Sequence, residues 1–107
     1  AGEQRLLLLA LLQRHYRQLL LCKILSQNGS TEAQTAAALG VPAFVARRLA
    51  QTARGYSLDQ LKSAYLQGIE VEFLIKSGQA AEEGALESLV LGLLHLRRQA
   101  EGGAALA

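Results

Sequence analysis

The chain has 107 residues, a formal net charge of +2 and 50% hydrophobic residues, which fits one compact domain. Leucine and alanine, both helix formers, supply 23 and 18 residues, and the few β-branched and aromatic residues argue against a β-sandwich or barrel. The apolar content and the small net charge argue against a disordered chain.

Helical spacing, capping residues and glycines predict a single all-α domain, a compact five-helix bundle-like unit over residues 1–107. The predicted helices are about 3–27, 31–39, 42–54, 57–77 and 82–98. Residues 99–107, rich in glycine and alanine, are expected to form a frayed tail.

The first predicted helix is apolar on more than one side. Its inward stripe is expected to comprise Leu8, Leu12, Tyr16, Leu19 and Ile24. Leu7, Leu11, Leu21 and Leu25 add further apolar surface, and a helix of this kind is either central in its domain or covered by a partner. Gly29 suits the left-handed position that ends the helix.

The same helix begins with a leucine run that imitates a secretory signal peptide. No small-residue cleavage site follows the run, and it is far shorter than the ~20 residues that span a bilayer. We interpret it as an apolar helix of a cytoplasmic protein with no membrane partner. The single cysteine, Cys22, allows no intrachain disulfide and is expected to be a core residue.

Residues 30–54 have the outline of a helix-turn-helix, with a capped short helix followed by a turn and an arginine-bearing helix. In a DNA-binding regulator Arg47, Arg48 and Arg54 would contact phosphates. The first residues of the second helix, Pro42 to Phe44, offer no polar side chain to read bases. A solvated basic face is the simpler interpretation, and the DNA-binding regulator stays open as the alternative function.

The fourth helix opens with a capping box at Ser57 and Gln60. Its inward stripe is expected to comprise Leu58, Leu61, Tyr65, Ile69 and Phe73. Gly68, costly in mid-helix, indicates a close helix crossing. For the fifth helix the inward residues are expected to be Leu86, Leu89, Val90, Leu93 and Leu96.

Residue types that carry catalysis or bind metals are sparse. His15 and His95 lack the paired spacing of a helical metal site, and no phosphate-binding glycine loop is present in the sequence. We therefore expect no catalytic residue, no metal and no cofactor in this chain.

The order of the pieces resembles the C-terminal domain of the bacterial DNA polymerase III delta subunit, over about residues 6–96. The segments that carry the resemblance are QRHYRQLL (13–20), LGVPAFV (39–45), RGYSLDQL (54–61), IEVEFLIKSG (69–78) and ALESLVL (85–91). This resemblance implies a collar domain, through which the delta subunit joins the other subunits of the clamp loader that places the sliding clamp on primed DNA.

The resemblance further implies delta-prime and the gamma/tau ATPase subunits as partners. The sliding clamp and DNA would be met only through the rest of the complex. The chain would be a C-terminal fragment of a non-catalytic subunit of the DNA polymerase III holoenzyme, with AAA+ modules before residue 1. The residues expected at the subunit interface are Leu21, Leu25, Phe44, Leu66 and Leu74.

Overall fold

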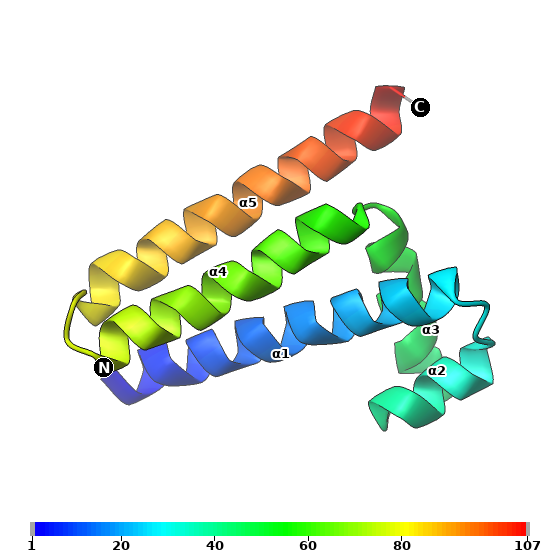
Figure 1. Cartoon of the computed structure of the whole chain (residues 1–107), viewed down its shortest axis with the longest axis horizontal. Helices are drawn as coiled ribbons and strands as arrows, with labels where there is room; N and C mark the ends of the chain where they lie inside the picture. The colour runs from blue at the N-terminus through cyan, green and yellow to red at the C-terminus, as the bar shows by residue number, and fades with distance from the viewer. Residues whose placement is uncertain (1, 107) are drawn as a thin grey trace.

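The computed structural model describes the backbone of residues 2–106 and the side chains of residues 3–102. The described residues form five helices, which follow one another along the chain (Figure 1). They are α1 (Gly2–Gln27), α2 (Glu32–Leu39), α3 (Ala43–Arg54), α4 (Leu58–Lys76) and α5 (Glu82–Leu106). The described residues contain no strand, so the predicted all-α fold class is confirmed.

Two helices begin at side chains that cap them. Thr31 accepts a hydrogen bond from the backbone N–H of Gln34, and Ser57 accepts one from the backbone N–H of Gln60. Each glutamine side chain accepts in return from the backbone N–H of its cap, which completes two capping boxes. Gly29 ends α1 in the left-handed region at φ 81°, as predicted.

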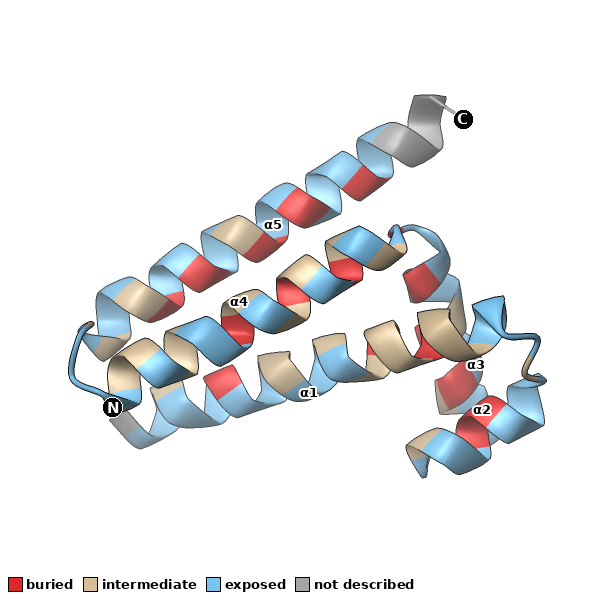
Figure 2. Cartoon of the chain, in the orientation of Figure 1, coloured by how far each residue is buried: buried red, intermediate tan, exposed pale blue. Residues whose placement is uncertain are grey.

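The three long helices α1, α4 and α5 lie side by side, and α4 runs opposite to the other two (Figure 1). The short helices α2 and α3 pack at one end, against the C-terminal half of α1. The arrangement leaves the outer sides of α4 and α5 facing solvent (Figure 2).

Among residues 3–102, whose side chains are described, the buried side chains form two core clusters. The first comprises Leu19, Cys22, Leu49, Ala53, Tyr56, Leu61 and Ala100. The second comprises Leu9, Ala64, Leu86, Leu89, Leu93 and Leu96. Tyr16 packs against both clusters and so joins the α3 end of the molecule to the three-helix body.

Glycine permits the close helix contact predicted at Gly68, which is buried where α4 crosses α1. A Cβ atom at this position would lie 2.9 Å from Cγ of Gln13 on α1. Gly92 plays the same part on α5, where a Cβ atom would meet the side chain of Gln67 on α4. A side chain at Gly68 would therefore require Gln13 to shift, whereas at Gly92 the flexible end of the Gln67 side chain would have to move aside.

The last helix is longer than predicted. Instead of ending at Arg98, α5 continues to Leu106, and residues 99–106 of the expected tail are helical, whereas residue 107 lies outside the described residues. The physical reason is Ala100, which is buried in the same core cluster as Tyr56 and Leu61 and so ties this turn of the helix to the core.

The predicted inward stripes were only partly right. On α4, Leu61 is buried but Ile69 and Phe73 are exposed, and the core side is formed by smaller residues, Ala64 and Gly68. The α1 stripe is displaced by one residue at its start, because Leu9 is buried and Leu8 is exposed. Val90 is likewise exposed on α5.

Among the described residues, no helix combines the length and the apolar content needed to cross a bilayer. The leucine run of α1 is part of a helix that packs along one side against α4 and α3.

Candidate interaction surfaces

Large apolar side chains reach the surface on the outer side of α4. Leu66 is 60% exposed, Phe73 is 62% exposed, and Ile69 between them is also exposed. Their spacing of three and four residues places them on one side of the helix, about opposite to buried Ala64 and Gly68. Three aligned apolar side chains in water are what a partner surface would cover.

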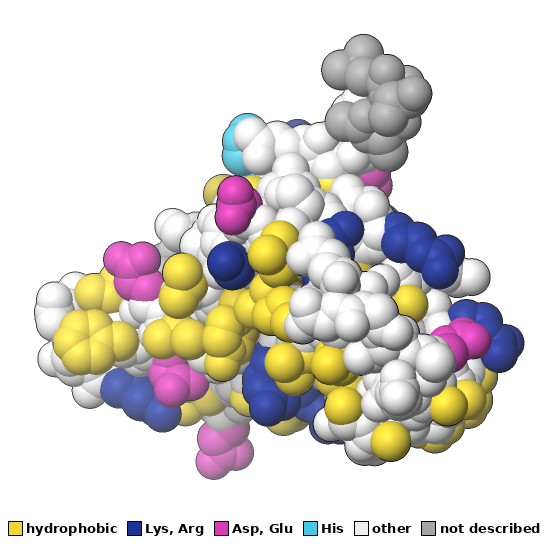
Figure 3. Space-filling model, turned by 45° about the vertical axis from the view of Figure 1, so that its right-hand side comes forward, with side chains coloured by type: hydrophobic (Ala, Val, Ile, Leu, Met, Phe, Trp, Pro, Cys, Tyr) yellow, Lys and Arg dark blue, Asp and Glu magenta, His cyan; other side chains and the backbone are white. Residues whose placement is uncertain are grey.

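The N-terminal half of α1 has the same character. Leu6, Leu7, Leu8 and Leu11 are all exposed, and among these neighbours only Leu9 is buried. Figure 3 shows hydrophobic side chains reaching the surface over a continuous band on one face of the molecule. The apolar residues of this domain therefore exceed what its own core covers.

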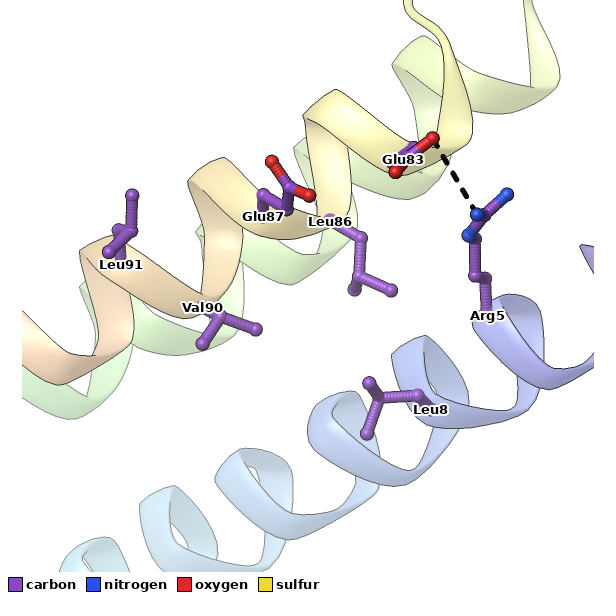
Figure 4. Close-up of a pocket in the computed structure, with 7 residues that line it drawn as sticks. All are labelled: Arg5, Leu8, Glu83, Leu86, Glu87, Val90 and Leu91. Carbon is purple, nitrogen blue, oxygen red and sulfur yellow. Dashed lines mark ion pairs between the residues drawn. The ribbon is translucent and has the colours of Figure 1, made fainter. Parts of the chain in front are cut away.

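A groove lies between α1 and α5 where these two helices are only loosely packed (Figure 4). It has a volume of about 510 Å³, and its apolar lining is Leu8, Leu86, Val90 and Leu91. Leu86 and Val90 project from α5 toward α1, whereas Glu87 and Leu91 project from the outer side of the α5 ribbon (Figure 4).

An ion pair closes one end of this groove. The Arg5 guanidinium lies 3.6 Å from the Glu83 carboxylate, and both side chains are exposed (Figure 4). A solvent-exposed pair of this kind contributes at most about 1 kcal/mol, so a partner could displace it at small cost.

His15 and Tyr16 of α1 and Tyr56, which lies between α3 and α4, line a second hollow beside the C-terminal part of α5. Burial, with a contribution from neighbouring Tyr56, raises the pKa of Tyr16 to about 12. Burial also lowers the pKa of His15. The His15 and Tyr16 rings are arranged edge to face, with 5.3 Å between their centroids. Both shifts disfavour the charged form of the side chain, which is the effect of partial burial.

The corner formed by α2 and α3 carries the arginines considered for phosphate contacts. Arg47 donates a 2.8 Å hydrogen bond to the Glu32 carboxylate on α2, and the Arg48 guanidinium lies 5.9 Å from the centre of the Phe44 ring. Arg54 lines a polar hollow beside α1. Two of the three arginines are therefore engaged within the domain.

The structure places the five residues expected at an interface in two groups. Phe44 and Leu66 are exposed, whereas Leu21, Leu25 and Leu74 are half-buried. They do not form one patch, because Phe44 lies at the α3 end and Leu66 lies midway along α4.

The predicted interface set leaves out several exposed apolar residues. They are Leu7, Leu11, Ile69, Phe73, Leu91 and Leu94. The signal that could have found those on α4 is the small pair Ala64 and Gly68, which shares a side with Leu61 and marks the side where helices approach closely.

Cys22 is a free thiol in the core, as predicted, and burial raises its pKa. No group of three or more potential metal ligands comes together within the described part of the chain. Buried side-chain polar atoms without a hydrogen-bond partner are likewise absent from that part. The features that call for a partner in the described residues are therefore apolar.

The sequence of this chain matches the model of a known protein family. The model of the DNA polymerase III delta subunit, C-terminal domain, matches residues 1–93. The chain belongs to this family. The match runs through all of α1 to α4 and half of α5, so it includes both core clusters apart from Leu96 and Ala100.

No curated protein and no solved structure matches the chain. For this delta-family domain, candidate interface residues are therefore chosen by their exposure in the structure, and core residues by their burial.

Proposed function

We propose that this chain is the collar domain of a cytoplasmic delta subunit, and that it assembles the clamp loader by binding the helical domains of other subunits. The partners would be delta-prime and the gamma/tau ATPase subunits. The observation that carries the proposal is the family match over residues 1–93. The domain's part in replication is then structural, with chemistry performed elsewhere in the complex.

The surface of the domain supports this role. Leu66 and Phe44 are exposed large side chains on different helices, which suits a domain that contacts more than one neighbour. Exposed aromatic and aliphatic side chains are the usual anchors of protein interfaces, where burial of each contributes to affinity.

The test is a binding measurement with purified C-terminal domains of the other clamp-loader subunits. The chain and each partner domain are mixed and followed by light scattering behind a sizing column. We expect a mixed complex with the unaltered chain and a weakened one with Leu66→Glu, because the charge would have to be buried at the contact. Phe44→Glu examines the α3 end in the same way.

Gln51→Glu is the matched control, since it adds the same negative charge at an exposed position on α3. It should leave binding unchanged. Failure of the unaltered chain to bind any of the partner domains would contradict the proposed function. Normal binding by both Leu66→Glu and Phe44→Glu would contradict the choice of these residues as anchors.

A further inference from the structure

A polar hollow lies at the corner where the C-terminal half of α1 meets α2 and α3 (Figure 1). Its volume is about 430 Å³, which is within the range of small-molecule sites. The polar part of its lining consists of two arginines, three hydroxyls, one amide and one carboxylate. These residues are Ser26, Ser30, Glu32, Thr35, Arg47, Gln51 and Arg54.

A smaller hollow adjoins the first and adds a third cation. The two hollows share Ser26 and Arg54, and Lys23 lines the smaller one. The Lys23 ammonium lies 3.4 Å from the backbone carbonyl of Ala53, to which it donates a hydrogen bond across the contact of α1 with α3. The described residues that line the joined space therefore include three cations and a single carboxylate.

The sequence around the hollow has the same positive character. Residues 6–58 include six lysines and arginines but only one carboxylate, that of Glu32. Residues 59–107 include four lysines and arginines and seven carboxylates. Positive charge is therefore concentrated in the part of the chain that forms the hollow, and this charge attracts anions to it.

The two arginines of the hollow differ in what they bind within the domain. Arg47 donates a 2.8 Å hydrogen bond to the Glu32 carboxylate, so an anionic group already lies against this guanidinium. Among the described residues, none forms an ion pair with Arg54. Its planar group has five N–H donors in a geometry that matches phosphate and carboxylate, and water occupies them until an anion arrives.

We propose that this hollow binds a terminal phosphate group, as carried by a free nucleotide or by the phosphorylated end of a nucleic-acid strand. Such a group has three strong acceptor oxygens and a charge of about −1.5 to −2 at neutral pH. Two guanidinium groups and the hydroxyls beside them can satisfy these oxygens. The exposed pair of Arg47 with Glu32 is weak, so Arg47 can turn to the phosphate at small cost.

Other ligand chemistries fit this lining less well. A divalent cation would meet one carboxylate and three positive groups, and an apolar molecule would strip water from the arginines without replacing it. The hollow is also recessed between three helices, so it suits a phosphate at the end of a molecule better than a phosphodiester within a duplex.

Arg48 separates this inference from the helix-turn-helix alternative. A DNA-binding face would use Arg47, Arg48 and Arg54 along α3, whereas Arg48 lines neither hollow and lies 5.9 Å from the centre of the Phe44 ring. The phosphate hollow instead combines two residues of α3 with groups from α1 and α2. It does not rest on the proposed function, because its residues were not chosen as subunit anchors.

The experiment is a titration of the isotope-labelled full chain with inorganic phosphate at constant ionic strength, followed by two-dimensional NMR. We expect saturable shifts centred on the amides of Ser26, Ser30 and Arg54, with a Kd in the millimolar range. Arg54→Gln should weaken binding about fivefold or more, because it removes the charge and the forked donors. Arg48→Gln is the matched control, since it makes the same change at an exposed position of the same helix.

Glu32→Gln tests the hollow in the opposite direction. Loss of its one carboxylate frees Arg47, so phosphate should bind about twofold more tightly or better. Glu83→Gln removes the same charge beside the distant Arg5 and should leave the Kd unchanged. All four altered side chains are exposed, so the variants should keep the fold, which their amide spectra check. Shifts that do not saturate, or equal effects of each variant and its control, would overturn the inference.

The two sources of the phosphate are distinguished with AMP and with a short oligonucleotide that carries or lacks a 5′-phosphate. Tighter binding of AMP than of the phosphorylated strand supports a nucleotide ligand, and the reverse order supports a strand end. Equal binding of the phosphorylated and unphosphorylated strands would overturn the assignment to a terminal phosphate. Binding of other subunits is measured with different proteins, so failure of the phosphate titration leaves the proposed function standing.

Discussion

Leu61 and Phe73 lie on the same helix and on the same sequence-predicted stripe, but the structure treats them oppositely. Leu61 is 0% exposed in the first core cluster, and Phe73 is 62% exposed on the outer side of α4. The sequence pattern predicts a similar loss of stability when either residue is replaced by alanine. The structure predicts a large loss only for Leu61.

We expect Leu61→Ala to lower the free energy of unfolding by about 3 kcal/mol, because removal of a buried leucine loses transfer energy and leaves a cavity. In a domain of this size that corresponds to a fall in Tm of about 12 °C or more. Phe73→Ala removes a side chain with only a minor part of its surface covered, so the expected loss is about 1 kcal/mol or less. The higher helix propensity of alanine offsets part of it.

The assay is urea denaturation followed by far-UV circular dichroism, at a protein concentration low enough to keep the chain monomeric. Both variants should keep the m-value of the unaltered chain, so that the shift in midpoint reports stability. A Phe73→Ala loss of 3 kcal/mol or more, the size typical of a buried phenylalanine, would refute the placement of α4.

Three further predictions test the cap, the buried tyrosine and the buried thiol. Ser57→Ala should cost about 1 kcal/mol in a denaturant titration, because the backbone N–H of Gln60 loses its 3.0 Å acceptor. In an ultraviolet titration Tyr16 should ionise with a pKa of about 12, and since this pKa is raised from 10.0 on folding, stability should fall as pH rises from about 10 to 12. Cys22 should react with a thiol reagent much more slowly in the native chain than in denaturant, since it is buried and its pKa is raised by that burial.

The fold class, the number of helices and most helix boundaries could be predicted from local signals. Thr31, Ser57, Gly29 and Gly40 act within a few residues of themselves, so their effect on helix ends is readable in sequence. The end of α5 was not readable in this way. It depends on the burial of Ala100 in the core cluster that contains Tyr56, a residue far from it in the chain.

The inward stripes were harder to predict because leucine occurs on nearly every side of α1 and α4. Hydrophobic periodicity identifies a core side only when the other side is polar, and Phe73 and Ala64 show how the inference fails. The larger residue is in water and the smaller one is in the core, because close helix contact at Gly68 leaves room only for small neighbours.

The excess of apolar surface follows from the composition of the helices. A domain of about a hundred residues buries a limited share of its surface, and here much of the core consists of alanine and of leucines on the facing sides of three helices. Leu7 and Leu91, which lie outside that core, contribute nothing to it. Neighbouring exposed apolar side chains are typical of surfaces that a partner covers, and the family to which the chain belongs is that of a subunit's terminal domain. The surface of this domain thus points to association for the same physical reason that its interior points to a helical bundle: burial of leucine side chains.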